Sequence, residues 1–141
     1  MQALVYRKER LLKRLEKLKE YRHDLKEMQD LSFDEYIRDK KTRYSIERLL
    51  FLIAENILDF LDHILSSRFE IISDSYEDIL ARSYEKNLIN EVMYSNLKGL
   101  GGFRNILAHE YLILSNEEVF RNFKKMVAVM DGVIDSFEEL L

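Results

Sequence analysis

The segment IERLLFLIAENILDFLDHIL, residues 46–65, carries apolar side chains on more than one side of a helix. A helix with this pattern lies at the centre of a bundle or also faces another subunit. Upstream, Ser32-Phe-Asp-Glu35 has the form of a capping box, in which the serine and glutamate side chains each bind a helix-terminal amide. The pattern therefore predicts one continuous central helix that begins after Ser32 and ends near Ser67.

Further helices are predicted on both sides of this segment. A first helix over about residues 3–30 has leucines spaced by seven, at Leu4, Leu11, Leu18 and Leu25. A short helix should follow Ser73 and end near Tyr84, and another should run from about residue 89 into a glycine-rich stretch. The last helix, about 116–140, should begin at a second capping box, Ser115–Glu118. We expect an all-α protein, an up-and-down four-helix bundle with a short extra helix, in a single domain over residues 1–141.

Composition excludes several classes of protein. The 141 residues include no cysteine, so neither a disulfide framework nor a thiolate metal site can form. No apolar run reaches the roughly 18 residues of a membrane span, and the N-terminus lacks the apolar segment of a secretory signal, so we expect a cytoplasmic protein with no membrane contact. The net charge of −4 argues against a dedicated nucleic-acid binder. The basic N-terminal segment nevertheless fits either a solvated helix face or a strip that contacts phosphates.

The stretch GLGGFRNILAHEY, residues 99–111, departs from a generic bundle because it holds three of the four glycines. Such a cluster indicates a helix end, a close backbone approach or room for a ligand. Arg104 and His109 are about 140° apart on an ideal helix, so they project together only if the helix ends between them or the groove is broad. Asn105 and His109 share a face, and Tyr111 is expected on the connection that follows.

These residue types suit phosphate chemistry. Arginine offers fixed donors to a phosphate and stays cationic, whereas histidine exchanges protons near neutral pH. Together they could cleave RNA, with His109 transferring protons, Arg104 stabilising charge on phosphorus and Tyr111 positioning the substrate. The alternative without catalysis is that this arginine and histidine are ordinary polar groups at the surface or at an interface.

The string Arg104-Asn105-Ile-Leu-Ala-His109-Glu-Tyr111 resembles the R-x4-H-x-Y signature of the HepT toxins in the HEPN superfamily. The segment from residue 46 to His63 resembles the second helix of that family, and the order of elements fits over essentially the whole chain.

The resemblance implies a homodimer whose two motifs face each other across the interface. It also implies a metal-independent endoribonuclease, encoded beside a minimal nucleotidyltransferase that serves as antitoxin. Arg104 and His109 match the catalytic pair of the family, Asn105 the adjoining polar position, and Tyr111 a tyrosine that the partner can modify with AMP. Asp59 and His63 fall where the family often has supporting polar residues on the second helix. No cofactor and no metal ion is expected.

Two other interpretations remain open at this point. The chain could be a non-catalytic helical subunit that binds a nucleotide or docks a nucleotidyltransferase, in which case Arg104 binds phosphate and Tyr111 is a contact or modification site. It could also be a helical dimer whose motif is only a polar cluster at the interface.

Overall fold

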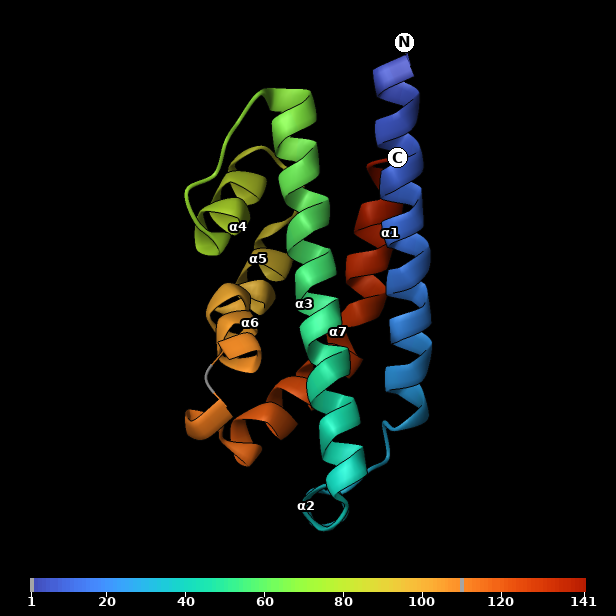
Figure 1. The fold of residues 1–141 in the computed structure, drawn as a ribbon. Helices are drawn as coiled ribbons and strands as arrows, with labels where there is room; N and C mark the ends of the chain where they lie inside the picture. Colours follow the sequence, from blue (N-terminus) through green and yellow to red (C-terminus); the bar gives the residue numbers. More distant parts are fainter. Residues whose placement is uncertain (1, 110) are drawn as a thin grey trace.

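The computed structural model describes residues 2–109 and 111–141, with side chains over residues 8–109 and 112–141. The described residues form helices, turns and short connections and contain no strand, which confirms the all-α prediction. Helix α3 (Lys40–Phe69) runs through the middle, with α1 on one side and α4, α5 and α6 on the other, and α7 crosses from below α6 to the side of α1 (Figure 1). No helix in this part of the chain is long and apolar enough to cross a membrane.

Helix α3 forms the centre of the core because apolar side chains surround it. It packs against α1, α2, α4, α6 and α7. Among the described residues, its side chains from Ile46 to Leu65 include more buried residues than any other helix supplies. Each buried leucine, isoleucine or phenylalanine stabilises the fold by roughly 1.5–3 kcal/mol. The central position predicted from residues 46–65 is therefore confirmed within a single chain.

The predicted continuous helix after Ser32 is wrong in one respect, because the chain forms α2 (Phe33–Arg38) and then restarts as α3. The capping box of Ser32 and Glu35 is present as predicted. The break falls at Asp39, whose extended backbone ends α2 and whose carboxylate accepts hydrogen bonds from the Lys41 amide (3.1 Å) and the Thr42 hydroxyl (2.7 Å). A second N-cap inside the run thus lets the chain change direction.

The burial of α2 explains why this break is favourable. Tyr36 is fully buried, and Phe33 packs edge-on against Phe120 of α7 with ring centroids 5.4 Å apart. A straight continuation of α3 would not place these rings against α7. The contact joins residues that are distant in sequence, so the local pattern could not reveal it.

Helices α1 (Gln2–Glu27) and α7 (Asn116–Glu139) complete one side of the bundle. The predicted leucine seam of α1 is buried at Leu11, Leu18 and Leu25, whereas the side chain of Leu4 lies outside the described residues. Basic residues of α1 pair with acidic residues of α7, as in Lys26–Asp131 (2.7 Å). Arg22–Asp131 (3.1 Å) and Lys19–Glu138 (3.2 Å) follow the same pattern, which supports a solvated face over a strip reserved for phosphates.

The remaining side is built from three short helices where the sequence predicted two. These are α4 (Tyr76–Glu85), α5 (Glu91–Leu97) and α6 (Leu100–His109), followed by the 3₁₀ turn η1 (Tyr111–Ile113). The predicted uninterrupted helix from residue 89 is wrong, because α5 ends and α6 begins around Gly99, whose φ is +88°. A Cβ atom on Gly101 would lie less than 3.0 Å from Cβ of Tyr76, so this glycine permits the close approach of α6 to α4. Two of the three expected reasons for the glycine cluster, a helix end and a close backbone approach, are thus both present.

Candidate functional site

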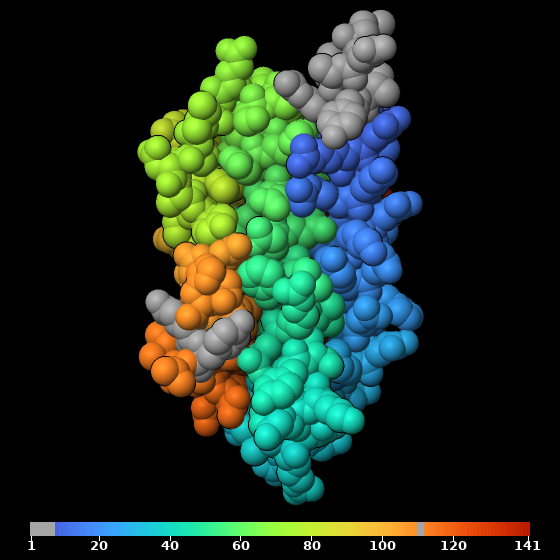
Figure 2. Space-filling view, viewed as in Figure 1, coloured from blue at the N-terminus to red at the C-terminus, as the bar shows by residue number. Residues whose placement is uncertain are grey.

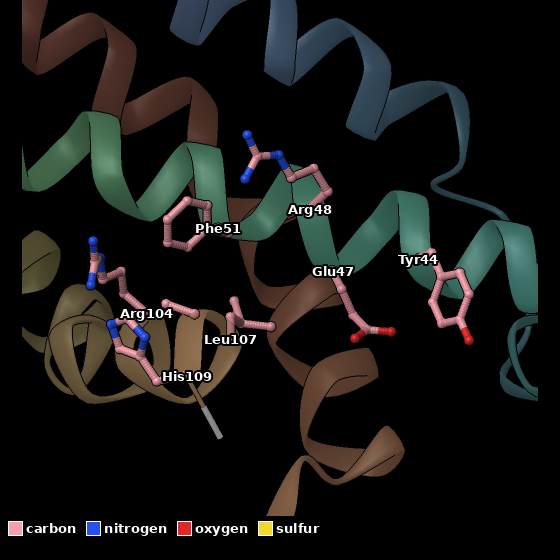
Figure 3. Close-up of a pocket in the computed structure, with 8 residues that line it drawn as sticks. Tyr44, Glu47, Arg48, Phe51, Arg104, Leu107 and His109 are labelled. Atoms are coloured by element: carbon pink, nitrogen blue, oxygen red, sulfur yellow. The ribbon is translucent and has the colours of Figure 1, made fainter. Parts of the chain in front are cut away.

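An open groove lies between α3 and α6, with a volume of about 470 Å³ (Figure 3). In the space-filling view the side chains of α3 reach the surface between α1 and α6 (Figure 2). The groove is lined by Tyr44, Glu47, Arg48, Phe51, Arg104, Leu107, Ala108 and His109.

Arg104 enters this groove from α6 and is held on several sides. Its Nε donates a hydrogen bond to Glu55 of α3 (2.6 Å), and Nη1 donates to Oδ1 of Asn105 (3.1 Å). The guanidinium also lies over the rings of Phe51 and Tyr76, 5.1 and 5.2 Å from their centroids. The hydrogen bond to Glu55 raises the pKa of Arg104 further above its ordinary value, so the side chain stays cationic at any working pH.

His109 is the last residue of α6 and is exposed at the groove. It follows Arg104 by five positions, yet both side chains line the same cavity (Figure 3). The groove also extends along α3 from Phe51 to Tyr44. A second subunit is therefore not required to bring the two residues to one groove.

Asn105 is not among the described residues that line this groove. It lines a neighbouring depression between α3, α4 and α6, together with Asp62 and Tyr76. Although Asn105 and His109 were predicted to share a face of the helix, they line different cavities. Through its hydrogen bond, Asn105 instead helps to orient the Arg104 guanidinium.

Asp59 and His63 are not part of the groove lining formed by the described residues. Asp59 forms an ion pair with Arg14 of α1 (3.3 Å), and burial raises the pKa of its carboxyl group above the ordinary value. Its charge still acts at a distance on Arg104, whose cationic form it favours. This is the smallest of the influences that raise the pKa of Arg104, and His63 is a half-buried residue one turn further along α3.

The backbone of Tyr111 begins η1, on the connection between α6 and α7 where it was expected. Its side chain lies outside the described residues.

A candidate cation site is found elsewhere on the surface. Of the described residues, His23, Asp24 and Glu27 on the exposed side of α1 have donor atoms within 4.8 Å of one another. His23 and Glu27 already pair with each other at 3.1 Å, as neighbouring residues of a solvated helix do. The groove itself is thus distinct from this cluster.

Comparison with known proteins agrees with this geometry. A family model described as ribonuclease HepT-like matches residues 11–137, which include the groove and all six of the predicted site residues. The chain belongs to the HepT-like family.

Individual relatives of this HepT-like chain include a curated protein named tRNA nuclease HepT from Aphanizomenon flos-aquae. It is 29% identical over 107 residues, which are 76% of this chain and 73% of the relative. Among solved structures, the tri-AMPylated HEPN toxin of Shewanella oneidensis in complex with MNT antitoxin has a TM-score of 0.79 and 21% identity, covering 92% of this chain and 96% of that one. The Bacillus subtilis cytosolic protein YutE, of unknown function, has a TM-score of 0.74 and 19% identity, with coverage of 90% and 87%. These solved structures share the fold of the HepT-like chain.

Three groups that hold Arg104 in this HepT-like protein were missed by sequence reasoning, namely Glu55, Phe51 and Tyr76. Glu55 and Phe51 are one helical turn apart on α3 and therefore face α6 together. The available signal was a carboxylate at position 55 inside an otherwise apolar run. Tyr76 gave no signal, because its approach depends on the glycine of α6.

Proposed function

We propose that this protein is an endoribonuclease toxin of a toxin–antitoxin pair that cleaves RNA in the groove between α3 and α6. The observation that supports this most directly is that Arg104 and His109 line one open groove, with Arg104 held by Glu55 and two aromatic rings. The name of the Aphanizomenon relative, a tRNA nuclease, supports RNA as the substrate.

In the proposed reaction, the 2′-oxygen of a ribose attacks the adjacent phosphorus, and the bond from phosphorus to the 5′-oxygen breaks. His109 takes the proton of the 2′-hydroxyl or gives a proton to the departing 5′-oxygen. Arg104 stabilises the negative charge that builds on the pentacoordinate phosphorus. The products are a 2′,3′-cyclic phosphate and a free 5′-hydroxyl. The proposed mechanism is metal-independent, because side chains supply both the proton transfer and the charge stabilisation.

A further part of the proposal is that two copies pair with their motifs facing each other. Leu112 and Ile113 support this, because both are exposed apolar residues directly after the motif. A second subunit over this region would cover them. A monomeric mass in light scattering at micromolar concentration would contradict the homodimer.

The proposal places the protein in the cytoplasm with a minimal nucleotidyltransferase as its partner. This partner acts as antitoxin and attaches AMP to Tyr111. The solved complex of an AMPylated HEPN toxin with MNT antitoxin supports this partner. Co-expression with the neighbouring nucleotidyltransferase should add adenylate mass to the wild-type protein. The Tyr111→Phe variant should gain no such mass.

The decisive experiment measures RNA cleavage in vitro and growth arrest on expression for the wild type and His109→Ala. His109 is exposed, so the variant should fold, and the rate should fall by about 10²–10⁴-fold. His23→Ala is the matched control, because His23 is also an exposed histidine but lies on α1 outside the groove. Equal cleavage by the folded His109→Ala protein would remove this residue from the mechanism.

One observation favours a second candidate, a non-catalytic helical subunit that binds a nucleotide or a nucleotidyltransferase. The carboxylate of Glu55 already neutralises part of the charge of Arg104. In this case neither wild type nor variant cleaves RNA, and Arg104→Ala weakens nucleotide or partner binding instead.

A further inference from the structure

The end of the groove away from Arg104 and His109 has a chemical character of its own. It is built by α3, with Tyr44 and Glu47 one turn apart, and with Arg48 extending toward Phe51 (Figure 3). Figure 3 shows the Tyr44 ring and the Glu47 carboxylate extending from neighbouring turns of α3 to the same side of the helix. The cleavage scheme above uses none of these three residues.

Phe51 connects the two ends of the groove electrostatically. The guanidinium of Arg48 lies 5.4 Å from the centroid of its ring, and that of Arg104 lies 5.1 Å from the same centroid. Glu55 offsets the charge of Arg104, whereas Arg48 forms no ion pair among the described residues. Two guanidiniums beside one ring suit a chain of phosphodiesters, with one phosphate at Arg104 and a neighbouring phosphate at Arg48.

Tyr44 gives this end of the groove a platform for a base. Its side chain is an aromatic ring in the groove wall, and the residue is 59% exposed. Seven residues along α3 separate it from Phe51, or about 10 Å of helix, which is the reach of one or two nucleotides. Unpaired bases of single-stranded RNA commonly stack on rings of this kind. The groove also continues past Tyr44, which together with Arg48 lines the next depression toward α1.

Glu47 limits which base fits. Burial raises the pKa of its carboxyl group, against the opposing attraction of Arg43. A carboxylate repels phosphate and accepts hydrogen bonds, so its partner must be a group with donors. Guanine is the base that presents two adjacent donors, N1–H and N2–H, on its Watson–Crick edge. Adenine, cytosine and uracil each place an acceptor beside their donor on that edge.

We propose that Tyr44 and Glu47 form a guanine-binding subsite beside the scissile phosphate, in which the base stacks on Tyr44 and donates two hydrogen bonds to Glu47. Arg48 binds the phosphate between this nucleotide and the reacting one. The proposal rests on the proposed ribonuclease function, because it assigns the subsite a place next to the cleaved bond.

The first test maps cleavage positions in a random-sequence RNA by sequencing the product ends. The wild type should show guanine enriched about tenfold or more at one fixed position beside the cut. Glu47→Gln should lose this enrichment, because an amide offers one acceptor where the carboxylate offers two. Tyr44→Ala should raise KM more than it lowers kcat, and Tyr44→Phe should restore the wild-type KM because it keeps the ring. Glu85→Gln, an exposed substitution at the end of α4, is the matched control and should keep the enrichment.

A binding measurement separates failure of the subsite from failure of the ribonuclease function. Fluorescence anisotropy with the His109→Ala protein compares a labelled pentanucleotide carrying one guanosine with the same strand carrying inosine or adenosine. Tighter binding of guanosine by about tenfold, lost in Glu47→Gln, supports the subsite even if the wild type cleaves no RNA. Cleavage or binding with no guanine preference overturns the subsite and leaves the ribonuclease function intact.

Discussion

Gly101 of α6 lies so close to α4 that even one methyl group has no room. A Cβ atom at this position would lie less than 3.0 Å from Cβ of Tyr76 and 3.2 Å from its Cγ. Because Cβ of Tyr76 is attached directly to the backbone of α4, a rotamer change cannot relieve the clash, and α4 and α6 must separate. Overpacking of this kind costs about 1–3 kcal/mol, offset in part by the roughly 0.5–1 kcal/mol that alanine gains over glycine in a helix. We therefore expect Gly101→Ala to lower Tm by about 3–8 °C.

Gly102→Ala is the matched control, because a Cβ atom on this neighbouring glycine meets nothing within 4 Å. The same substitution one residue along α6 should leave Tm unchanged or raise it by about 2–4 °C. Thermal unfolding followed by circular dichroism measures both variants. Gly101→Ala should also slow RNA cleavage, since Tyr76 packs on Arg104. A Tm for Gly101→Ala equal to or above that of Gly102→Ala would refute the close packing of α4 on α6.

Three further predictions concern other parts of the structure. Glu55→Ala should lower kcat for RNA more than it changes KM and should cost about 1–2 kcal/mol of stability in urea unfolding, because Arg104 loses its charged acceptor. Glu55→Gln keeps an acceptor for Nε and should retain more of the activity and the stability. Equal losses in the two variants would contradict this role of Glu55. Burial raises the pKa of Tyr36 to about 12, so the folded state favours the neutral phenol. The stability that this preference contributes should be complete below pH about 10 and lost as pH rises toward 12. Tyr36→Phe should abolish that part of the pH dependence of Tm. Ser115→Ala should lower the free energy of unfolding by about 1 kcal/mol because the amide of Glu118 loses its acceptor at the start of α7, whereas Ser115→Thr should retain most of it.

Local sequence signals predicted the elements of this fold better than their interruptions. Apolar periodicity over residues 46–65 predicted the central helix, and Ser32 and Ser115 marked helix starts that the structure contains. The break at Asp39 was missed because it depends on Tyr36 and Phe33 packing against α7, a contact across more than 80 residues. A capping residue inside a helical run can either remain within one helix or begin a new one, and only tertiary packing selects between these two structures.

The candidate site shows the same division between local and distant information. Arg104 and His109 were picked out by their residue types and by resemblance to one short motif, and both line the groove. The sequence placed them about 140° apart on α6, and it could not show that α3 lies alongside and widens the groove enough to receive both. Tyr44, Glu47 and Arg48 looked like ordinary residues near the start of a long helix, because their role depends on the position of α6.

The contacts around Arg104 suit an arginine at this position better than a lysine. Its Nε is bound by Glu55 and its Nη1 by Asn105, while its planar face is enclosed by Phe51 and Tyr76. These contacts hold the guanidinium in one orientation, so under the proposed function little rotamer entropy would be lost when a phosphate binds. A lysine offers a single nitrogen, which can bond either Glu55 or a phosphate. Unlike a guanidinium, it has no second, planar donor edge to present to a phosphate while Glu55 holds it in place. The Glu55 carboxylate therefore both lowers the net charge of the groove and orients the remaining donors of Arg104. Its removal should leave the charge of Arg104 uncompensated and its guanidinium without a fixed orientation.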